Sequence, residues 1–173
     1  TGDSRVDWFT TTTNTSNFAA APTGSTAGTA NSGSISGWST TAAADNAWRT
    51  TGGAKTANDP CPAGWRVPTS AEWTDVHNNN SHSRTTPWGA SGNTEYGNAL
   101  HYGPNTSTKL LTLPAAGHRS NTNGTLINRG FGYYWSSTEN STNARDMVFD
   151  GSVVFPANST NRTVGYSLRC IAE

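Results

Sequence analysis

The alternation of apolar and polar side chains is clearest in the last forty residues of the chain. Four runs show it, and these are 131–135, 147–149, 153–155 and 166–170. A period of two with polar partners is typical of strands that bury one face. Asp150-Gly151 supplies a turn between two of the runs. The pattern predicts three or four short antiparallel strands in the C-terminal third.

A helix is predicted over about residues 69–79. Thr69 and Glu72 have the S/T-x-x-E spacing of a capping box, in which each side chain can bond the other residue's backbone N–H. Trp73, Val76 and His77 follow at i, i+3 and i+4, so one face of the helix is apolar.

The remainder of the C-terminal part is less patterned. Residues 81–109 are predicted to be mostly loop, whereas the run KLLTLPAAG at 109–117 is the most apolar of the chain and predicts a buried strand. One helix followed by short antiparallel strands with irregular connections gives an α+β fold class that is rich in loops.

Residues 1–57 differ in character from residues 58–173. Small, polar and Gly-rich stretches at 10–17 and 19–37 have the composition of a linker. Aromatic residues interrupt them at wide intervals, namely Trp8, Phe9, Phe18, Trp38 and Trp48. We therefore expect 1–57 to be an extended segment packed on a domain formed by 58–173. The alternative is a partly ordered arm.

Composition shows where the core area comes from. Leu, Ile, Val and Phe sum to only 21 residues, whereas there are seven Trp and five Tyr. Since each aromatic side chain buries about 150–250 Å², a small aromatic core is expected. Thr, Ser and Asn sum to 65 of 173 residues, a composition that favours an extracellular setting.

The charge balance excludes two kinds of partner. Acidic and basic residues number 11 each, and the net charge is zero. We expect no nucleic-acid binding, which needs a basic surface, and no polybasic membrane contact. No run approaches the roughly 18 apolar residues of a membrane span, so no membrane insertion is expected. Thr1 onward is polar, which suggests a mature or trimmed fragment.

The two cysteines, Cys61 and Cys170, lack the spacing of a redox dithiol or a zinc ribbon. They are expected to form one disulfide, which would indicate an oxidising compartment. The alternative is two buried free thiols.

Four separated motifs carry a family resemblance, and they are NDPCPAGWRVPTSAEW (58–73), LPAAGHR (113–119), YYWSSTE (133–139) and NRTVGYSLRC (161–170). They resemble the Fibrobacter succinogenes major paralogous domain family over about residues 58–173. That resemblance implies a C-type-lectin-like fold and a surface, secreted or phage protein that binds other molecules.

The same resemblance implies a link to diversity-generating retroelements, which randomise adenines in Asn-type codons of a template. Such changes cannot produce Lys, Gln, Glu, Met or Trp. Residues 140–163 contain no Lys, Gln, Glu or Trp, and their one Met is Met147, an expected core position.

Under this resemblance the ligand-facing positions lie between framework residues of the C-terminal strands. Met147 and Phe149 are expected to be buried beneath one exposed face. The candidate variable residues are Asn140, Ser141, Asn143, Arg145, Asp146, Val148, Asp150, Ser152, Val154, Asn158, Ser159, Thr160 and Asn161, with Tyr133 and Tyr134 bordering the site.

The expected function is an extracellular receptor-binding or adhesion module for a protein or glycan on a cell surface. The alternative is a structural domain of a pilus or surface array without a dedicated ligand. No cofactor is expected. A calcium site has little support, because only Glu139, Asp146 and Asp150 supply carboxylates near the tail and the sugar-binding tripeptides of C-type lectins are absent. An enzyme of the formylglycine-generating type is the least favoured class, since the disulfide would use both cysteines.

Overall fold

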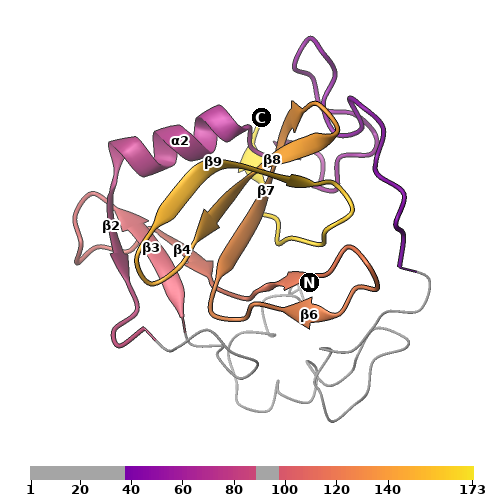
Figure 1. The fold of residues 1–173 in the computed structure, drawn as a ribbon. Coiled ribbons are helices and arrows are strands. Elements are labelled where there is room, and N and C mark those ends of the chain that lie inside the picture. The colour runs from indigo at the N-terminus through magenta and orange to yellow at the C-terminus, as the bar shows by residue number, and fades with distance from the viewer. Residues whose placement is uncertain (1–37, 89–97) are drawn as a thin grey trace, which may run out of the picture.

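The computed structural model describes residues 38–88 and 98–173, which form an α+β fold of one short helix and small antiparallel sheets (Figure 1). The elements in chain order are β1 (Trp65–Arg66), α2 (Ser70–Asn79), β2 (Ser81–Arg84), β3 (Ala99–Gly103), β4 (Leu111–Pro114), β5 (His118–Arg119), β6 (Leu126–Ile127), β7 (Gly132–Asn140), β8 (Asn143–Phe149), β9 (Val154–Asn161) and β10 (Ile171–Ala172). The aromatic residues Trp8, Phe9 and Phe18 lie outside the described residues, as does the packing expected for 1–37.

The predicted helix is present as α2, with Thr69 as its N-cap. The Thr69 hydroxyl accepts from the Glu72 N–H, and the Glu72 carboxylate accepts from the Thr69 N–H at 2.7 Å. Arg66 also donates to this carboxylate, and its hydrogen bond is the main reason that the pKa of Glu72 falls to about 2. The helix start is therefore fixed by local side chains, as the sequence predicts.

The longest strands form the sheet β7-β8-β9, which is antiparallel throughout. A register shift between Trp135 and Glu139 interrupts the pairing of β7 with β8, and another between Asp146 and Val148 interrupts that of β8 with β9. Asp150 closes the turn between β8 and β9, because its Oδ1 accepts from the N–H groups of Ser152 and Val153. The predicted strands at 131–135, 147–149 and 153–155 all fall in this sheet.

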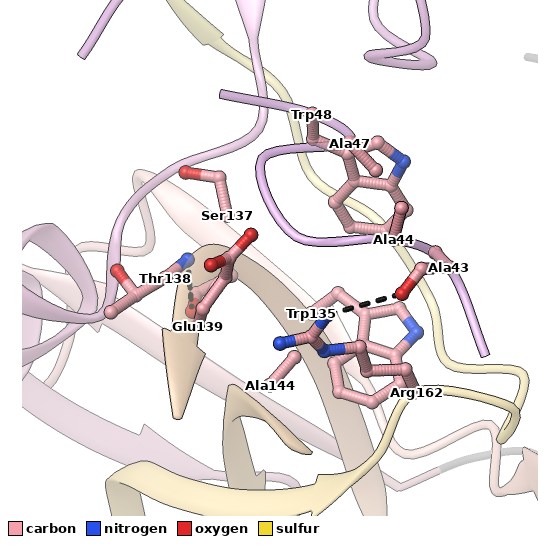
Figure 2. Close-up of a pocket in the computed structure, with 11 residues that line it drawn as sticks. Ala43, Ala44, Ala47, Trp48, Trp135, Ser137, Thr138, Glu139, Ala144 and Arg162 are labelled. Carbon is pink, nitrogen blue, oxygen red and sulfur yellow. Dashed lines mark hydrogen bonds between the residues drawn. The ribbon is translucent and has the colours of Figure 1, made fainter. Parts of the chain in front are cut away.

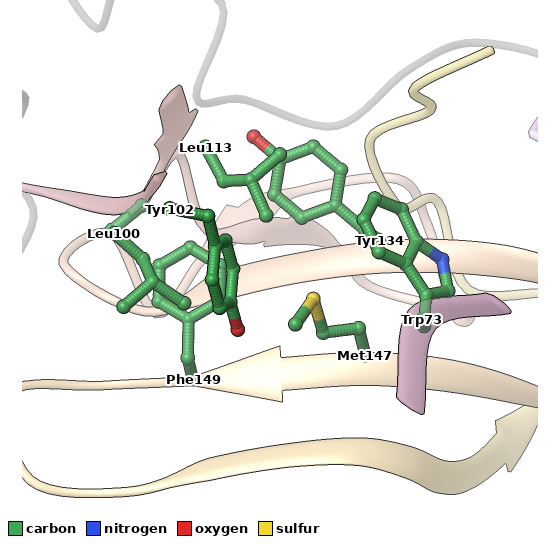
Figure 3. Packing of buried hydrophobic residues seen from close by; sticks show 8 residues of the cluster. Trp73, Leu100, Tyr102, Leu113, Tyr134, Met147 and Phe149 are labelled. Carbon is green, nitrogen blue, oxygen red and sulfur yellow. The ribbon is translucent and has the colours of Figure 1, made fainter. Parts of the chain in front are cut away.

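The core joins α2 to both three-stranded sheets (Figure 3). Its members are aromatic or large and apolar, and they are Trp73, Leu100, Tyr102, Leu113, Ala115, Tyr134, Met147 and Phe149. Met147 and Phe149 have no exposed surface, which confirms their expected burial. The Phe149 ring packs over Gly132, where a Cβ would lie 1.9 Å from the ring. Only glycine therefore fits at the start of β7.

Residues 81–109 were predicted to be mostly loop, and this holds only in part for those that the structure describes. They contain β2 and β3, which pair in the sheet β2-β3-β4. β2 has the polar sequence SHSR at the sheet edge, so it carries no apolar alternation. β3 is buried at all five positions and therefore does not alternate either. Both strands take their structure from tertiary packing rather than from local pattern.

Two further expectations need correction. In the run 109–117, only β4 is a strand, and its Leu113 is buried while Leu110 is 76% exposed. β4 is thus an edge strand whose Leu113 is buried, and Ala115 just after it also joins the core. Residues 166–170 do not form a strand, and they make one isolated bridge, between Tyr134 and Ser167.

The expected disulfide joins Cys61 to Cys170, which are 109 residues apart in sequence. It links the segment before α2 to the residues just before β10. β10 in turn pairs with β1, which also precedes α2. In the chain-entropy account, closing a loop of this length stabilises the fold by about 4–5 kcal/mol.

Among the described residues, no helix is long and apolar enough to cross a membrane.

Replacing both cysteines by serine is expected to lower the free energy of unfolding by about 4–5 kcal/mol, because the unfolded chain regains its loop entropy. Urea denaturation followed by tryptophan fluorescence measures the change. Peptide mapping of the unreduced protein is the control, and two alkylatable thiols in the native protein would contradict the assignment.

Candidate functional site

The sheet β7-β8-β9 has two faces with different surroundings. The inner face carries Tyr134, Met147 and Phe149 and packs against Trp73 of α2. Residues paired directly across antiparallel strands share a face, and neighbours along a strand alternate. Tyr133 and Val148 are therefore on the opposite, outer face, as the register places them opposite each other.

This alternation divides the candidate variable residues between the two faces. The outer face carries Tyr133, Asp146, Val148, Asn158 and Thr160. The inner face carries Tyr134, Asn140, Asn143, Arg145, Val154, Ser159 and Asn161. Ser141 lies in the turn between β7 and β8, and Asp150 and Ser152 lie at the turn before β9. These residues were expected to share a single exposed face. They do not, because side chains alternate between the two faces along each strand.

Tyr134 does not border an exposed site. It is 4% exposed, and its ring lies edge-on to that of Trp73 with centroids 6.1 Å apart. Its hydroxyl donates to the carbonyl of Pro114 at 3.0 Å. Burial raises the pKa of this hydroxyl well above its ordinary value. Tyr134 is a core residue because it pairs with Met147 on the inner face, whereas its neighbour Tyr133 lies on the outer face.

Three inner-face candidates form a polar network beyond the apolar core. Asn140 donates to the Ser159 hydroxyl at 2.8 Å, and Arg145 donates to the Asn140 side-chain oxygen and to the carbonyl of Ala157. These side chains hold the ends of β7, β8 and β9 together. Their interactions give them a structural role in the sheet.

The outer face of the sheet carries a set of residues that we call the outer patch, made of Tyr133, Asp146, Val148, Phe155, Asn158 and Thr160. Phe155 pairs with Val148 and is 55% exposed. Its alternation with Val153 suggested a buried strand face, so the sequence did not indicate it as a ligand-facing residue. The register pairing with Val148 is the signal that identifies it.

Aromatic rings pack against one side of the outer patch. Tyr166 lies over both Tyr133 and Trp135, with ring centroids 4.9 Å and 4.5 Å away. His118 packs on Tyr133 at 4.5 Å, and burial lowers its pKa from the ordinary value. These contacts bury Tyr133 and Trp135 while Phe155 and Asn158 stay open to solvent. The patch is therefore rigid on the β7 side and accessible on the β9 side.

Asp146 is the one carboxylate of the outer patch, and it has no exposed surface. Its Oδ2 accepts from the Asn158 amide at 3.1 Å, whereas its Oδ1 has no hydrogen-bond partner among the described residues. Burial raises the pKa of the carboxyl, and the hydrogen bonds from Asn158 and Thr160 oppose this rise only in part. Asp146 is thus a destabilising group at the centre of an otherwise well-packed face.

Residues 43–48 form a strap over one end of the sheet (Figure 2). Arg162 donates to the carbonyl of Ala43 and pairs with the Asp45 carboxylate at 2.6 Å. Between strap and sheet lies a small pocket lined mainly by alanine methyl groups and by the indoles of Trp48 and Trp135. Residues 43–48 therefore contact the sheet and the segment that follows it.

The three carboxylates considered for calcium are separate in their contacts. Glu139 accepts from the Asn46 N–H, Asp146 from Asn158, and Asp150 from its own turn. Within ranges 38–88 and 98–173, no three His, Cys, Asp or Glu side chains are grouped as metal ligands.

A comparison with protein families gives one match, and comparisons with curated proteins and with solved structures give none. The model described as the Fibrobacter succinogenes major domain matches residues 42–172. This range includes the strap, α2, both three-stranded sheets and the disulfide. It begins inside the segment 1–57 and spans more than half of the chain.

Replacing Asp146 by asparagine is expected to stabilise the protein at neutral pH by about 1–3 kcal/mol, because it removes a buried charge whose Oδ1 accepts no hydrogen bond among the described residues. The folded pKa lies above the unfolded value of about 3.9, so the wild type loses stability as the pH rises from about 4 through the folded pKa. The gain from Asp146→Asn should therefore be present at pH 7.5 and absent below pH 4. Urea denaturation at the two pH values measures it.

Asp150→Asn is the matched control, since the Asp150 carboxylate accepts two backbone N–H groups. We expect no gain from that variant. An Asp146→Asn protein less stable than wild type at pH 7.5 would show that the charge of Asp146 is compensated.

Proposed function

The chain belongs to the Fibrobacter succinogenes major domain family, and from this premise we propose that it is an extracellular ligand-binding module that uses the outer patch. Its role is receptor binding or adhesion, on a bacterial cell surface or a phage particle. The ligand is a molecule on another surface.

The main support for the proposal is that the outer patch exposes apolar and polar side chains while the inner face of the same strands is packed. Phe155 is 55% exposed beside Val148 and Asn158, while the opposite face of the same strands is closed by Met147 and Phe149. An exposed Phe next to short polar side chains suits a protein-binding surface, where aromatic residues supply most of the contact energy. Substitution on the outer side leaves the inner packing intact, so such a face can change its specificity at little cost in stability.

We propose a C-type-lectin-like arrangement for the fold. Support comes from one helix at the start of the domain, irregular short strands, a long antiparallel C-terminal hairpin and a disulfide that joins the two ends of the domain. The disulfide also supports an oxidising compartment and thus a secreted or surface protein.

Diversification by a retroelement is the further part of the proposal. In residues 140–163, substitution through Asn-type codons would reach Asp146, Asn158 and Thr160 on the outer patch. The absence of Lys, Gln, Glu and Trp from this stretch is consistent with such a mechanism. Tyr133 is also a residue that an Asn-type codon can yield.

A structural domain of a pilus or surface array is the second candidate. It is favoured by exposed apolar side chains away from the outer patch, of which Trp65 is 46% and Leu110 is 76% exposed. Contacts between copies would cover these residues. An enzyme of the formylglycine-generating type is not proposed, because Cys61 and Cys170 are bonded to each other and neither is a free nucleophile.

Replacing Phe155 by aspartate should reduce ligand binding at least tenfold, because it puts a charge in the apolar part of the outer patch. Labelled wild type and variant are compared on arrays of glycans and bacterial surface proteins. Leu110→Asp is the matched control, since Leu110 is exposed but lies before β4, outside the patch.

Equal loss of binding in the two variants would move the site away from the outer patch. A wild-type protein that binds nothing on these arrays, but forms ordered assemblies that Leu110→Asp or Trp65→Asp disrupts, would favour the structural candidate.

A further inference from the structure

The buried carboxylate of Asp146 suggests what the ligand carries. Building on the proposed function, we propose that the ligand is a protein whose Arg or Lys side chain enters the outer patch and pairs its cationic group with the free Oδ1 of Asp146.

Oδ1 of Asp146 is a buried acceptor that a ligand could satisfy. Asp146 has no exposed surface, and its Oδ1 has no hydrogen bond among the described residues. A buried acceptor without a donor destabilises the free protein, and more so when it is charged. A ligand that donates to Oδ1 removes that cost on binding, so the free oxygen favours a donor over any other group.

The basic side chains near Asp146 leave its Oδ1 without a cationic partner. Arg145 precedes Asp146 in β8 but donates to the Ala157 carbonyl and to Asn140 on the inner face. Arg162 is engaged by Asp45 at 2.6 Å on the strap. The Arg145 charge opposes the raised pKa of Asp146 only in part, and neither guanidinium group bonds Oδ1. A cation from outside can fill this role, whereas an anionic ligand would be repelled.

Aromatic rings lie around the Asp146 carboxylate. Trp135 pairs with Asp146 across β7 and β8, and Tyr133 is two residues away on the same face. Tyr166 packs on both rings. Burial raises the pKa of Tyr133 and of Tyr166, and the Asp146 charge adds to the rise. The faces of Tyr and Trp rings attract cations, and a guanidinium can also stack on them.

The entrance is the exposed side chain of Asn158. Its amide bonds Oδ2 of Asp146 at 3.1 Å and the Thr160 hydroxyl at 3.2 Å. Rotation of this one surface side chain opens the carboxylate toward solvent and leaves the backbone of β9 in place. The ligand cation then donates to Oδ1, while Phe155 contacts the apolar part of the ligand.

The ligand class follows from these groups. A guanidinium or ammonium group on a flexible apolar stem is protein side-chain chemistry, whereas common sugars are neutral or anionic. The site therefore favours a protein over a glycan, and a glycan ligand is an outcome that the experiment must be able to reveal.

The direct test uses N-acetyl-arginine amide and its uncharged isostere, N-acetyl-citrulline amide. Each is titrated into the wild-type protein while NMR follows the Asn158 side-chain amide and the Trp135 indole N–H. We expect saturable shifts with the arginine compound, at least tenfold weaker binding of the citrulline compound, and loss of the arginine effect in Asp146→Asn. Equal binding of both compounds, or arginine binding that survives Asp146→Asn, would overturn the inference.

A random dodecapeptide phage library separates this inference from the proposed function. It is selected against the wild type, and the selected peptides are then tested on Asp146→Asn and Phe155→Asp. Selected peptides enriched in Arg and Lys that need both residues support both proposals. Peptides that need Phe155 but lack this enrichment and bind Asp146→Asn equally would overturn the inference alone.

Two other outcomes are informative in the same comparison. Peptides that bind Phe155→Asp as well as wild type would overturn the outer patch as a protein-binding site, and this inference with it. Binding of the protein to neutral glycans that Phe155→Asp abolishes and Asp146→Asn preserves would leave the proposed function in place and exclude the cationic ligand.

Discussion

The structure depends on the closure of one face of the sheet β7-β8-β9. Tyr134, Met147 and Phe149 point inward from this sheet and pack against Trp73 of α2 and against Leu100 and Leu113 of the neighbouring sheet. Because side chains alternate along a strand, fixing these three residues also fixes which residues face outward. A slip of one residue in register would turn Asp146 into the apolar core and Met147 to the outer face, so the core determines the composition of the outer patch.

A small aromatic core needs help to hold such a face still. The disulfide joins the segment before α2 to the residues just before β10, and the strap is held to the sheet by Arg162 and Glu139. Together they tie both ends of the described domain to its C-terminal strands. This support explains how the fold tolerates Asp146, a buried carboxylate with one unpartnered oxygen. Groups that reduce stability are common where a protein binds something else.

Local chemistry made part of the fold predictable. The capping box of α2, the alternation of β7 to β9 and the pair of cysteines each depend on a few neighbouring residues or on a simple count. β2 and β3 were missed because one is a polar edge strand and the other is buried throughout, so neither alternates. The site was predictable by segment but not by face. Tyr134 was expected to border the site and is buried, whereas Phe155 was expected on a buried face and is exposed. Exposure depends on what packs over each strand. In addition, the bulge in β9 places Asn158 and Phe155 on the same face although they are three residues apart.

Sequencing of the segment that encodes 131–170, across many clones of the source population, tests the central claim most directly. The account predicts substitutions confined to adenines of Asn-type codons and concentrated at outer-patch positions such as Asp146, Asn158 and Thr160. It predicts none at Met147, Phe149 or Cys170, which the core and the disulfide require. A uniform sequence would contradict diversification, and variation concentrated on the inner-face positions would contradict the outer patch as the binding surface.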